Sequence, residues 1–128
     1  MKRLYVVRHA DSSWDNKLLS DYERPLSKQG IIDAKKIADH FVSQNYKLDS
    51  IVHSSALRTS QTADLLYETI NVDKKINLYH EKSLYNANTL EVINVINKYI
   101  SNFNNLMIVG HNPSVTQFIN YISNVTID

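Results

Sequence analysis

Three separated segments of the sequence carry side chains that suit the binding of a phosphoryl group. Arg8-His9 follows the first apolar stretch, residues 54–58 end in Arg58, and residues 110–113 contain His111. A guanidinium group presents a planar fork to two phosphate oxygens, and an imidazole can donate a further hydrogen bond. Each segment alone is also consistent with ordinary exposed polar side chains, so the prediction depends on their combination.

The absence of cysteine narrows the choice of nucleophile. None of the 128 residues is a cysteine, which excludes disulfides, thiolate zinc sites and cysteine-based phosphatase chemistry and leaves histidine, serine or a carboxylate. A neutral imidazole is a good nucleophile near pH 7, and its phosphoramidate splits one difficult displacement into two easier steps. We therefore predict that His9 attacks phosphorus while Arg8, Arg58 and His111 bind the phosphoryl oxygens.

Strand-like and helix-like segments alternate along the chain and must position these residues. Short apolar or β-branched runs predict strands at residues 4–7, 50–53, 76–79 and 106–109. Helical periodicity predicts helices after Ser27, from Ala56 to Ile70, after Asn88 or Thr89, and from near Pro113. The helix faces expected to be buried are Ala34, Ile37, Ala38 and Phe41; Thr59, Ala63, Leu66 and Ile70; Ile93, Ile96 and Ile100; and Val115, Phe118, Ile119 and Ile122.

This alternation predicts an α/β fold of three layers, in which helices cover both faces of a mostly parallel central sheet. Sites in such folds form at the carboxyl ends of the strands. A single domain over residues 1–128 is expected, because no repeat, low-complexity segment or glycine-serine linker divides the chain. The polar connection at residues 11–24 directly follows the first strand, and its length favours a functional loop over a flexible surface connection.

Composition and charge argue against several other classes of protein. Hydrophobic residues make up 43% and charged residues 21% of the chain, as is ordinary for a soluble globular domain. The net charge is +1 and no basic cluster indicates a nucleic-acid or membrane partner. Without a signal-like or membrane-spanning apolar run, a cytoplasmic location and a monomer are the default expectations. No HExxH, GxxxxGK[ST] or DxD motif is present, so we expect neither a metal nor another cofactor.

Four motifs, in order, resemble those of the histidine phosphatase superfamily, which also contains the cofactor-dependent phosphoglycerate mutases. The short length, Ala10, and residues 21–26 further resemble the SixA-type phosphohistidine phosphatases. The motifs that carry the resemblance are Arg8-His9-Ala10 (RHG or RHA), Arg24-Pro25-Leu26-Ser27 with Gly30 (RPLT and a following glycine), Ser55 to Thr62 (the start of a helix with an arginine and a QT pair), and Val109 to Pro113 (the closing GH).

The resemblance implies a phosphoglycerate mutase-like fold and a metal-independent phosphatase that forms a covalent phosphohistidine on His9. It also adds three candidate site residues. Arg24 is a further phosphate binder or, alternatively, the partner of a nearby surface carboxylate. Ser55 lies at a helix start that favours anions. Glu81, after the third strand, is a candidate proton donor or an ordinary solvated carboxylate, and the unmatched histidines His40 and His53 are interpreted as structural.

Three functions remain open on the sequence alone. The resemblance to the SixA type favours phosphohistidine on a signalling protein as the substrate. Its imidazole leaving group would need little proton donation, which makes Glu81 optional. A broad-specificity phosphomonoesterase acting on small metabolites would instead need an acid at Glu81, and a phosphate-binding protein without turnover would not need His9. Three-carbon phosphate mutase activity is disfavoured, because the larger mutases carry insertions for which this chain has no room.

The chain ends soon after the helix that follows His111, whereas members of the family usually continue through one or two further strands. We therefore expect a shortened C-terminal edge of the sheet, with exposed backbone groups near the fourth strand. Such an edge could pair with another chain, lower the stability or impair activity, although every matched motif lies before it.

Overall fold

Four parallel strands form a single sheet in the order β1-β4-β2-β3. The structure, a computed structural model, describes residues 1–123. The first, second and fourth predicted strands lie within observed strands, and the third begins one residue later than predicted and runs two residues further. The strands are β1 (Arg3–Arg8), β2 (Ser50–Ser54), β3 (Asn77–Glu81) and β4 (Asn105–Gly110).

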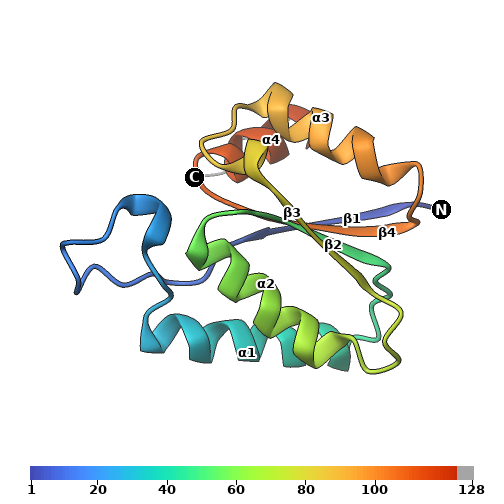
Figure 1. Cartoon of the computed structure of the whole chain (residues 1–128). Coiled ribbons are helices and arrows are strands. Elements are labelled where there is room, and N and C mark those ends of the chain that lie inside the picture. Colours follow the sequence, from blue (N-terminus) through green and yellow to red (C-terminus); the bar gives the residue numbers. More distant parts are fainter. Residues whose placement is uncertain (124–128) are drawn as a thin grey trace.

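Helices cover both faces of this sheet (Figure 1). One face carries α1 (Lys28–Ser43) and α2 (Leu57–Ile70), and the other carries α3 (Thr89–Ile100) and α4 (Ser114–Ser123). The predicted α/β class, with three layers and a parallel sheet, is therefore confirmed. Two short 3-10 helices, η1 (Asp21–Glu23) and η2 (Lys82–Leu84), lie in the connections. No helix within residues 1–123 has the length and hydropathy needed to cross a membrane.

Polar side chains define where α1 and α3 begin. The Ser27 hydroxyl accepts a hydrogen bond from the Gly30 N–H, which satisfies one of the free donors of the first turn. Asn88 accepts from the Glu91 N–H, and the Glu91 carboxylate accepts in return from the Asn88 N–H. Both helix starts agree with the sequence prediction, since Ser27 and Asn88 are the capping residues.

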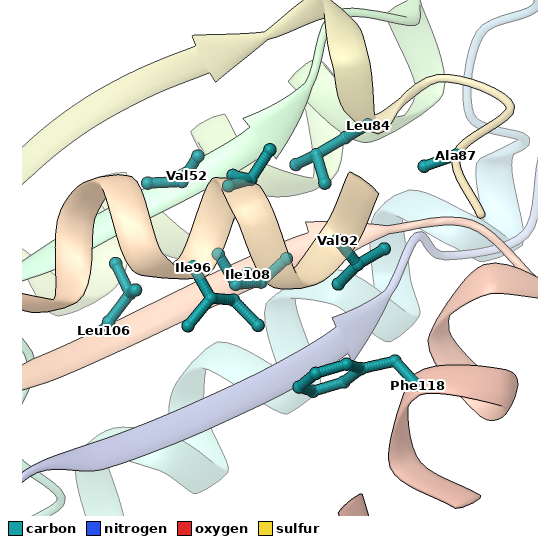
Figure 2. Packing of buried hydrophobic residues seen from close by; sticks show 9 residues of the cluster. Val52, Leu84, Ala87, Val92, Ile96, Leu106, Ile108 and Phe118 are labelled. Carbon is teal, nitrogen blue, oxygen red and sulfur yellow. The ribbon is translucent and has the colours of Figure 1, made fainter. Parts of the chain in front are cut away.

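Two hydrophobic clusters separate the sheet from its helices. Alternate residues of a strand point to opposite faces, so Leu106 and Ile108 face α3 and α4 while Met107 and Val109 face α1 and α2. Figure 2 shows Leu106 and Ile108 packed with Phe118 and neighbouring side chains in the first cluster. Because β4 is covered on both faces, its sequence is a continuous apolar run.

Several residues predicted to be buried lie on outer helix faces. Ile37 is 47% exposed and Ile122 is 54% exposed, so these two predictions are wrong. The buried residues of α1 are instead spaced four or three residues apart along one face of the helix. In α3 the buried face differs from the predicted one, and Ile93 and Ile100 are only partly buried. The buried residues are Gly30, Ala34, Ala38 and Phe41 in α1 and Val92, Val95 and Ile96 in α3.

The fourth strand does not lie at an edge of the sheet, contrary to the sequence expectation. β4 pairs with β1 on one side and with β2 on the other, so its backbone groups are not exposed there. The edge strands are β1 and β3. The parallel register places Arg8 opposite Gly110, which brings the first and last sequence motifs side by side.

Gly30 lies where α1 passes closest to the segment that follows β1. A Cβ atom at this position would be 2.0 Å from the carbonyl oxygen of Asp11, and this oxygen also accepts a hydrogen bond from the Ser27 N–H. The atoms that this Cβ would meet belong to the backbone of Asp11, so they cannot rotate away as a side chain could. Gly30 therefore permits the close approach that holds the segment after β1 against α1.

We expect Gly30→Ala to destabilise the protein by about 1–3 kcal/mol, because overlap with fixed backbone outweighs the better helix propensity of alanine. Thermal unfolding of this variant should be compared with that of Lys28→Ala, an exposed position in the same turn. Only Gly30→Ala should melt several degrees lower. An unchanged or higher melting temperature for Gly30→Ala would contradict the close-contact interpretation.

Candidate active site

A polar hollow lies at the carboxyl ends of the strands, where the segment between β1 and α1 extends beyond the sheet (Figure 1). Its volume is about 340 Å³. The residues that line it come from the end of β1, the following loop and α2: Arg8, His9, Ala10, Asp11, Ser12, Trp14, Arg24 and Arg58. Three arginines face one small space, so the hollow suits an anion.

The structure brings His9, His111, Arg8 and Arg58 together. The backbone N–H of His9 donates to the Gly110 carbonyl at 3.0 Å, which continues the pairing of β1 with β4. The ring centroids of His9 and His111 lie 5.3 Å apart with the rings steeply inclined. Arg58 Nε lies 3.3 Å from His9 Nε2, and Arg8, at the exposed end of β1, lines the hollow.

The hydrogen bonds of His9 define its tautomer. Its Nδ1 lies 2.7 Å from the Ala10 carbonyl oxygen, which can only accept, so Nδ1 carries the proton. Arg58 Nε–H donates to His9 Nε2, and arginine cannot accept, so Nε2 presents its lone pair. His9 is thus a neutral imidazole whose unprotonated nitrogen is directed at a guanidinium group.

Burial and neighbouring cations lower the pKa values of both histidines. For His9, burial is the largest cause, repulsion from Arg58, Arg8 and Arg24 adds to it, and a backbone hydrogen bond opposes it. For His111, burial, Arg58 and His9 together lower the pKa to about 4. Both imidazoles are therefore neutral near pH 7, which is the state required of a nucleophile.

His111 is only 6% exposed and is anchored through one ring nitrogen. Its Nε2 lies 2.7 Å from the Ser54 hydroxyl at the end of β2. Its Nδ1 is buried and has no hydrogen-bond partner among residues 1–123. A buried polar atom without a partner is uncommon, and His111 lies beside His9 but is not among the residues that line the hollow.

Arg24 lies at the hollow and also pairs with a nearby carboxylate. It lines the hollow, is 7% exposed, and forms an ion pair with Asp21 at 3.1 Å. It also donates to the Ser13 carbonyl at 3.1 Å and to the Ser12 hydroxyl. The Trp14 ring centroid lies 3.1 Å from the guanidinium carbon, a stacked cation–π contact. These contacts hold the Arg24 guanidinium in place at the wall of the hollow.

Asp21 is a central residue of the site that the sequence motifs identify only as a possible partner of Arg24. Its Oδ2 accepts from Arg58 at 3.0 Å and from the Tyr85 hydroxyl at 2.7 Å, while its Oδ1 accepts from Arg24. The hydrogen bond from Tyr85, with those from the arginines, lowers the pKa of Asp21 to about 2. Its place three residues before Arg24 was the available sequence signal, but nothing in the sequence connects it to Tyr85.

Glu81 and Ser55 do not line the hollow. Glu81 forms an ion pair with Lys98 at 2.7 Å and accepts from the Tyr99 hydroxyl. Burial would raise the pKa of Glu81, but these hydrogen bonds outweigh burial and lower it, so the carboxylate is ionised near pH 7. Ser55 accepts a hydrogen bond from the Tyr22 hydroxyl and faces a separate depression.

The two unmatched histidines also lie outside the hollow. His40 is exposed on α1, and His53 is buried in β2, where its Nδ1 donates to the Ser54 carbonyl at 2.8 Å. Among residues 1–123, no group of three or more histidine, cysteine, aspartate or glutamate side chains is arranged to hold a metal ion. The charged residues that line the hollow are Arg8, Arg24, Arg58 and Asp11.

Residues 4–88 match the model of the histidine phosphatase superfamily, branch 1. This match extends over more than half of the chain and includes Arg8, His9, Arg24 and Arg58. The chain therefore belongs to the histidine phosphatase superfamily.

Two curated relatives are longer proteins. The chain is 31% identical to an uncharacterised chloroplast protein of Arabidopsis thaliana, over 98% of this chain and 61% of that protein. It is also 31% identical to an uncharacterised protein of Mycobacterium tuberculosis, over 86% of this chain and 65% of that protein. The chain thus spans less than two thirds of the length of either relative.

Solved structures place the chain more finely within the family. The proposed phosphohistidine phosphatase SixA from Agrobacterium tumefaciens is 28% identical, with a TM-score of 0.85 over 94% of this chain and 75% of that one. A phosphoglycerate mutase from Plasmodium falciparum, 16% identical, has a TM-score of 0.68 over 98% of this chain and 71% of that one and supports the fold alone. The predicted SixA-like, phosphoglycerate mutase-like fold is confirmed.

Stability should fall in mild acid because of the buried histidines. An unfolded histidine has a pKa of about 6.5, whereas His111 in the folded protein has a pKa of about 4. Between these values the unfolded chain binds more protons, so the free energy of unfolding decreases as the pH falls through this window. His9 contributes in the same direction.

Thermal unfolding between about pH 7 and pH 5 tests this linkage. We expect the melting temperature of His111→Gln to decrease less over this pH range than the melting temperature of the wild-type protein. The matched control, His40→Gln, alters an exposed histidine and should follow the wild-type curve. Parallel curves for His111→Gln and the wild-type protein would show that His111 does not resist protonation in the folded state.

Proposed function

We propose that this protein is a phosphohistidine phosphatase that acts through a covalent phosphoryl group on His9. The observation that carries the proposal is the lone pair of His9 Nε2, which accepts from Arg58 in an arginine-lined hollow. The similarity to the proposed SixA phosphatase from Agrobacterium tumefaciens supports this substrate class. The physiological substrate is then a phosphohistidine-bearing signalling protein.

The arginines and His111 bind and stabilise the phosphoryl group. Phosphoryl transfer spreads negative charge over three equatorial oxygens, so fixed cationic donors lower the barrier. Arg8 and Arg58 present guanidinium groups to these oxygens, Arg24 adds a third at the wall of the hollow, and His111 provides a neutral ring beside the nucleophile. This arrangement supplies the required positive charge without a metal ion.

The reaction proceeds in two displacements. The hydrogen bond from Arg58 to His9 Nε2 breaks first, and the freed lone pair attacks phosphorus. The P–N bond to the substrate imidazole breaks and its electron pair stays on the leaving nitrogen. Because the other nitrogen of that ring carries a proton, the ring leaves as neutral imidazole. The phosphorylated His9 ring is cationic, and its Nδ1–H donates to the Ala10 carbonyl, which stabilises the charge. Water then attacks phosphorus, the electron pair returns to Nε2, and inorganic phosphate with its protons is released.

The position of Glu81 favours phosphohistidine over a small phosphate ester. An alkoxide leaving group needs a proton donor in the transition state, whereas an imidazole leaving group is far less basic. Glu81 is ionised, paired with Lys98 and Tyr99, and does not line the hollow. A substrate that needs little proton donation therefore suits this site better.

Incubation with a radiolabelled phosphohistidine carrier domain, and separately with small labelled phosphates, tests the covalent step. We expect rapid quenching to trap an acid-labile, base-stable phosphoryl group on the wild-type enzyme. The label should be absent from His9→Gln and present in His40→Gln. Label on a serine or aspartate would contradict the proposal, and phosphate binding without any label or release would favour a binding protein.

Glu81→Gln, compared with Lys98→Gln, tests the substrate class. Both variants break the same ion pair, but only Glu81→Gln removes the carboxylate. The ion pair contributes little to the stability of the fold, because Lys98 is well exposed. We expect both to hydrolyse phosphohistidine at rates close to the wild-type rate. A fall of about a hundredfold on sugar phosphates, confined to Glu81→Gln, would instead identify Glu81 as a general acid and favour a phosphomonoesterase.

A further inference from the structure

Asp21 holds one edge of the Arg58 guanidinium group. Arg58 Nη1 donates to the Asp21 backbone carbonyl at 2.6 Å, and Nη2 donates to the Asp21 carboxylate at 3.0 Å. The remaining edge, through Nε, is directed at His9 Nε2. Because a guanidinium group is planar and rigid, holding one edge sets the direction of the other.

We infer that Asp21, supported by Tyr85, is a positioning residue that aims Arg58 at the phosphoryl group transferred to His9. The inference rests on the proposed function, since it assigns a role in that same site. Asp21 does not act on the reacting atoms itself. It acts through Arg58, whose side-chain hydrogen-bond partners within residues 1–123 are His9 and Asp21.

Asp21 also sets the spacing of two buried cations. Arg24 and Arg58 are each 7% exposed, and each forms an ion pair with a different oxygen of the Asp21 carboxylate. Without this shared anion, the two neighbouring guanidinium groups would repel each other. The carboxylate therefore keeps both cations at the wall of the hollow before substrate binds.

Tyr85 supports Asp21 from a distant part of the chain. Its hydroxyl donates to the same Asp21 oxygen that Arg58 uses, and its ring packs against Tyr22 and His111 at centroid distances of 4.8 and 5.7 Å. Tyr85 lies between η2 and α3, and through these contacts it joins that segment to η1 and to His111. Its removal should loosen Asp21 without removing the carboxylate.

The alternative role for Asp21 is that of an internal competitor. Its carboxylate could occupy the place of a phosphoryl group and have to leave before substrate binds. The two roles predict opposite kinetics: removal of a competitor raises turnover or affinity, whereas removal of a positioning residue lowers turnover. The use of separate guanidinium edges for Asp21 and His9 favours positioning.

Asp21→Asn keeps the shape of the side chain and removes its charge. We expect kcat on the phosphohistidine carrier domain to fall about ten- to a hundredfold, with KM and the Kd for inorganic phosphate unchanged. Glu23→Gln, on the same short helix and bonded only within its own turn, should behave like the wild-type enzyme. An unchanged or increased kcat in Asp21→Asn would overturn the inference.

A titration of His9 by NMR tests the positioning without any substrate. If Arg58 turns away in Asp21→Asn, His9 loses a repulsive neighbour and its pKa rises, although Arg8, Arg24 and His111 remain. If Arg58 stays and only the negative charge is lost, the pKa of His9 falls. A fall or no change would therefore overturn the positioning role.

The two proposals can fail separately. Absence of a phosphoenzyme in the wild-type protein would remove the proposed function, while a raised His9 pKa in Asp21→Asn would still support the positioning of Arg58.

Tyr85→Phe serves as a second variant, because it keeps Asp21 and deletes a single hydroxyl. It should shift kcat and the His9 pKa in the same directions by smaller amounts, and an effect of opposite sign in a folded Tyr85→Phe protein would contradict the inference.

Discussion

The pairing of β1 with β4 is the contact on which the site depends. These strands lie at opposite ends of the chain, and their parallel register places Arg8 opposite Gly110, after which the His9 N–H continues the ladder to the Gly110 carbonyl. A shift of one residue would turn every side chain of β1 to the other face. Alternate residues of both strands pack into different clusters, so this shift would exchange the side chains that fill each cluster. Core packing therefore determines where His9 and His111 meet.

The hollow combines several positive charges with a neutral His9. Three guanidinium groups would attract an anion strongly, and the same charges depress the pKa values of the adjacent imidazoles. One carboxylate, Asp21, partly offsets the cations but remains bonded to them and to Tyr85, away from His9. The result is an electropositive site that contains a neutral histidine, and this combination is what nucleophilic attack on a phosphoryl group requires.

The fold was predictable wherever one local pattern determined burial. Strand β4 is buried on both faces and reads as an apolar run, and Ser27 and Asn88 have the side chains that cap helices. Strand β3 is an edge strand with a mixed burial pattern, so its boundaries were less accurate, and Ile37 fits a helical stripe by spacing although it faces solvent. The strand order could not be predicted, because the pairing of β4 between β1 and β2 is a tertiary choice that local sequence does not encode.

The same distinction explains which site residues could be found. His9, Arg58 and His111 follow strands whose carboxyl ends share one edge of the sheet, so their proximity follows from topology. Asp21 lies in the short helix η1 and Tyr85 in the connection after η2, 64 residues apart, and their contact is a tertiary one that no local pattern encodes. Glu81 is the last residue of β3, but Lys98 and Tyr99 on α3 hold its carboxylate. Position at the end of a strand brings a residue to the correct edge, whereas the partners supplied by neighbouring helices decide whether its side chain can reach the substrate.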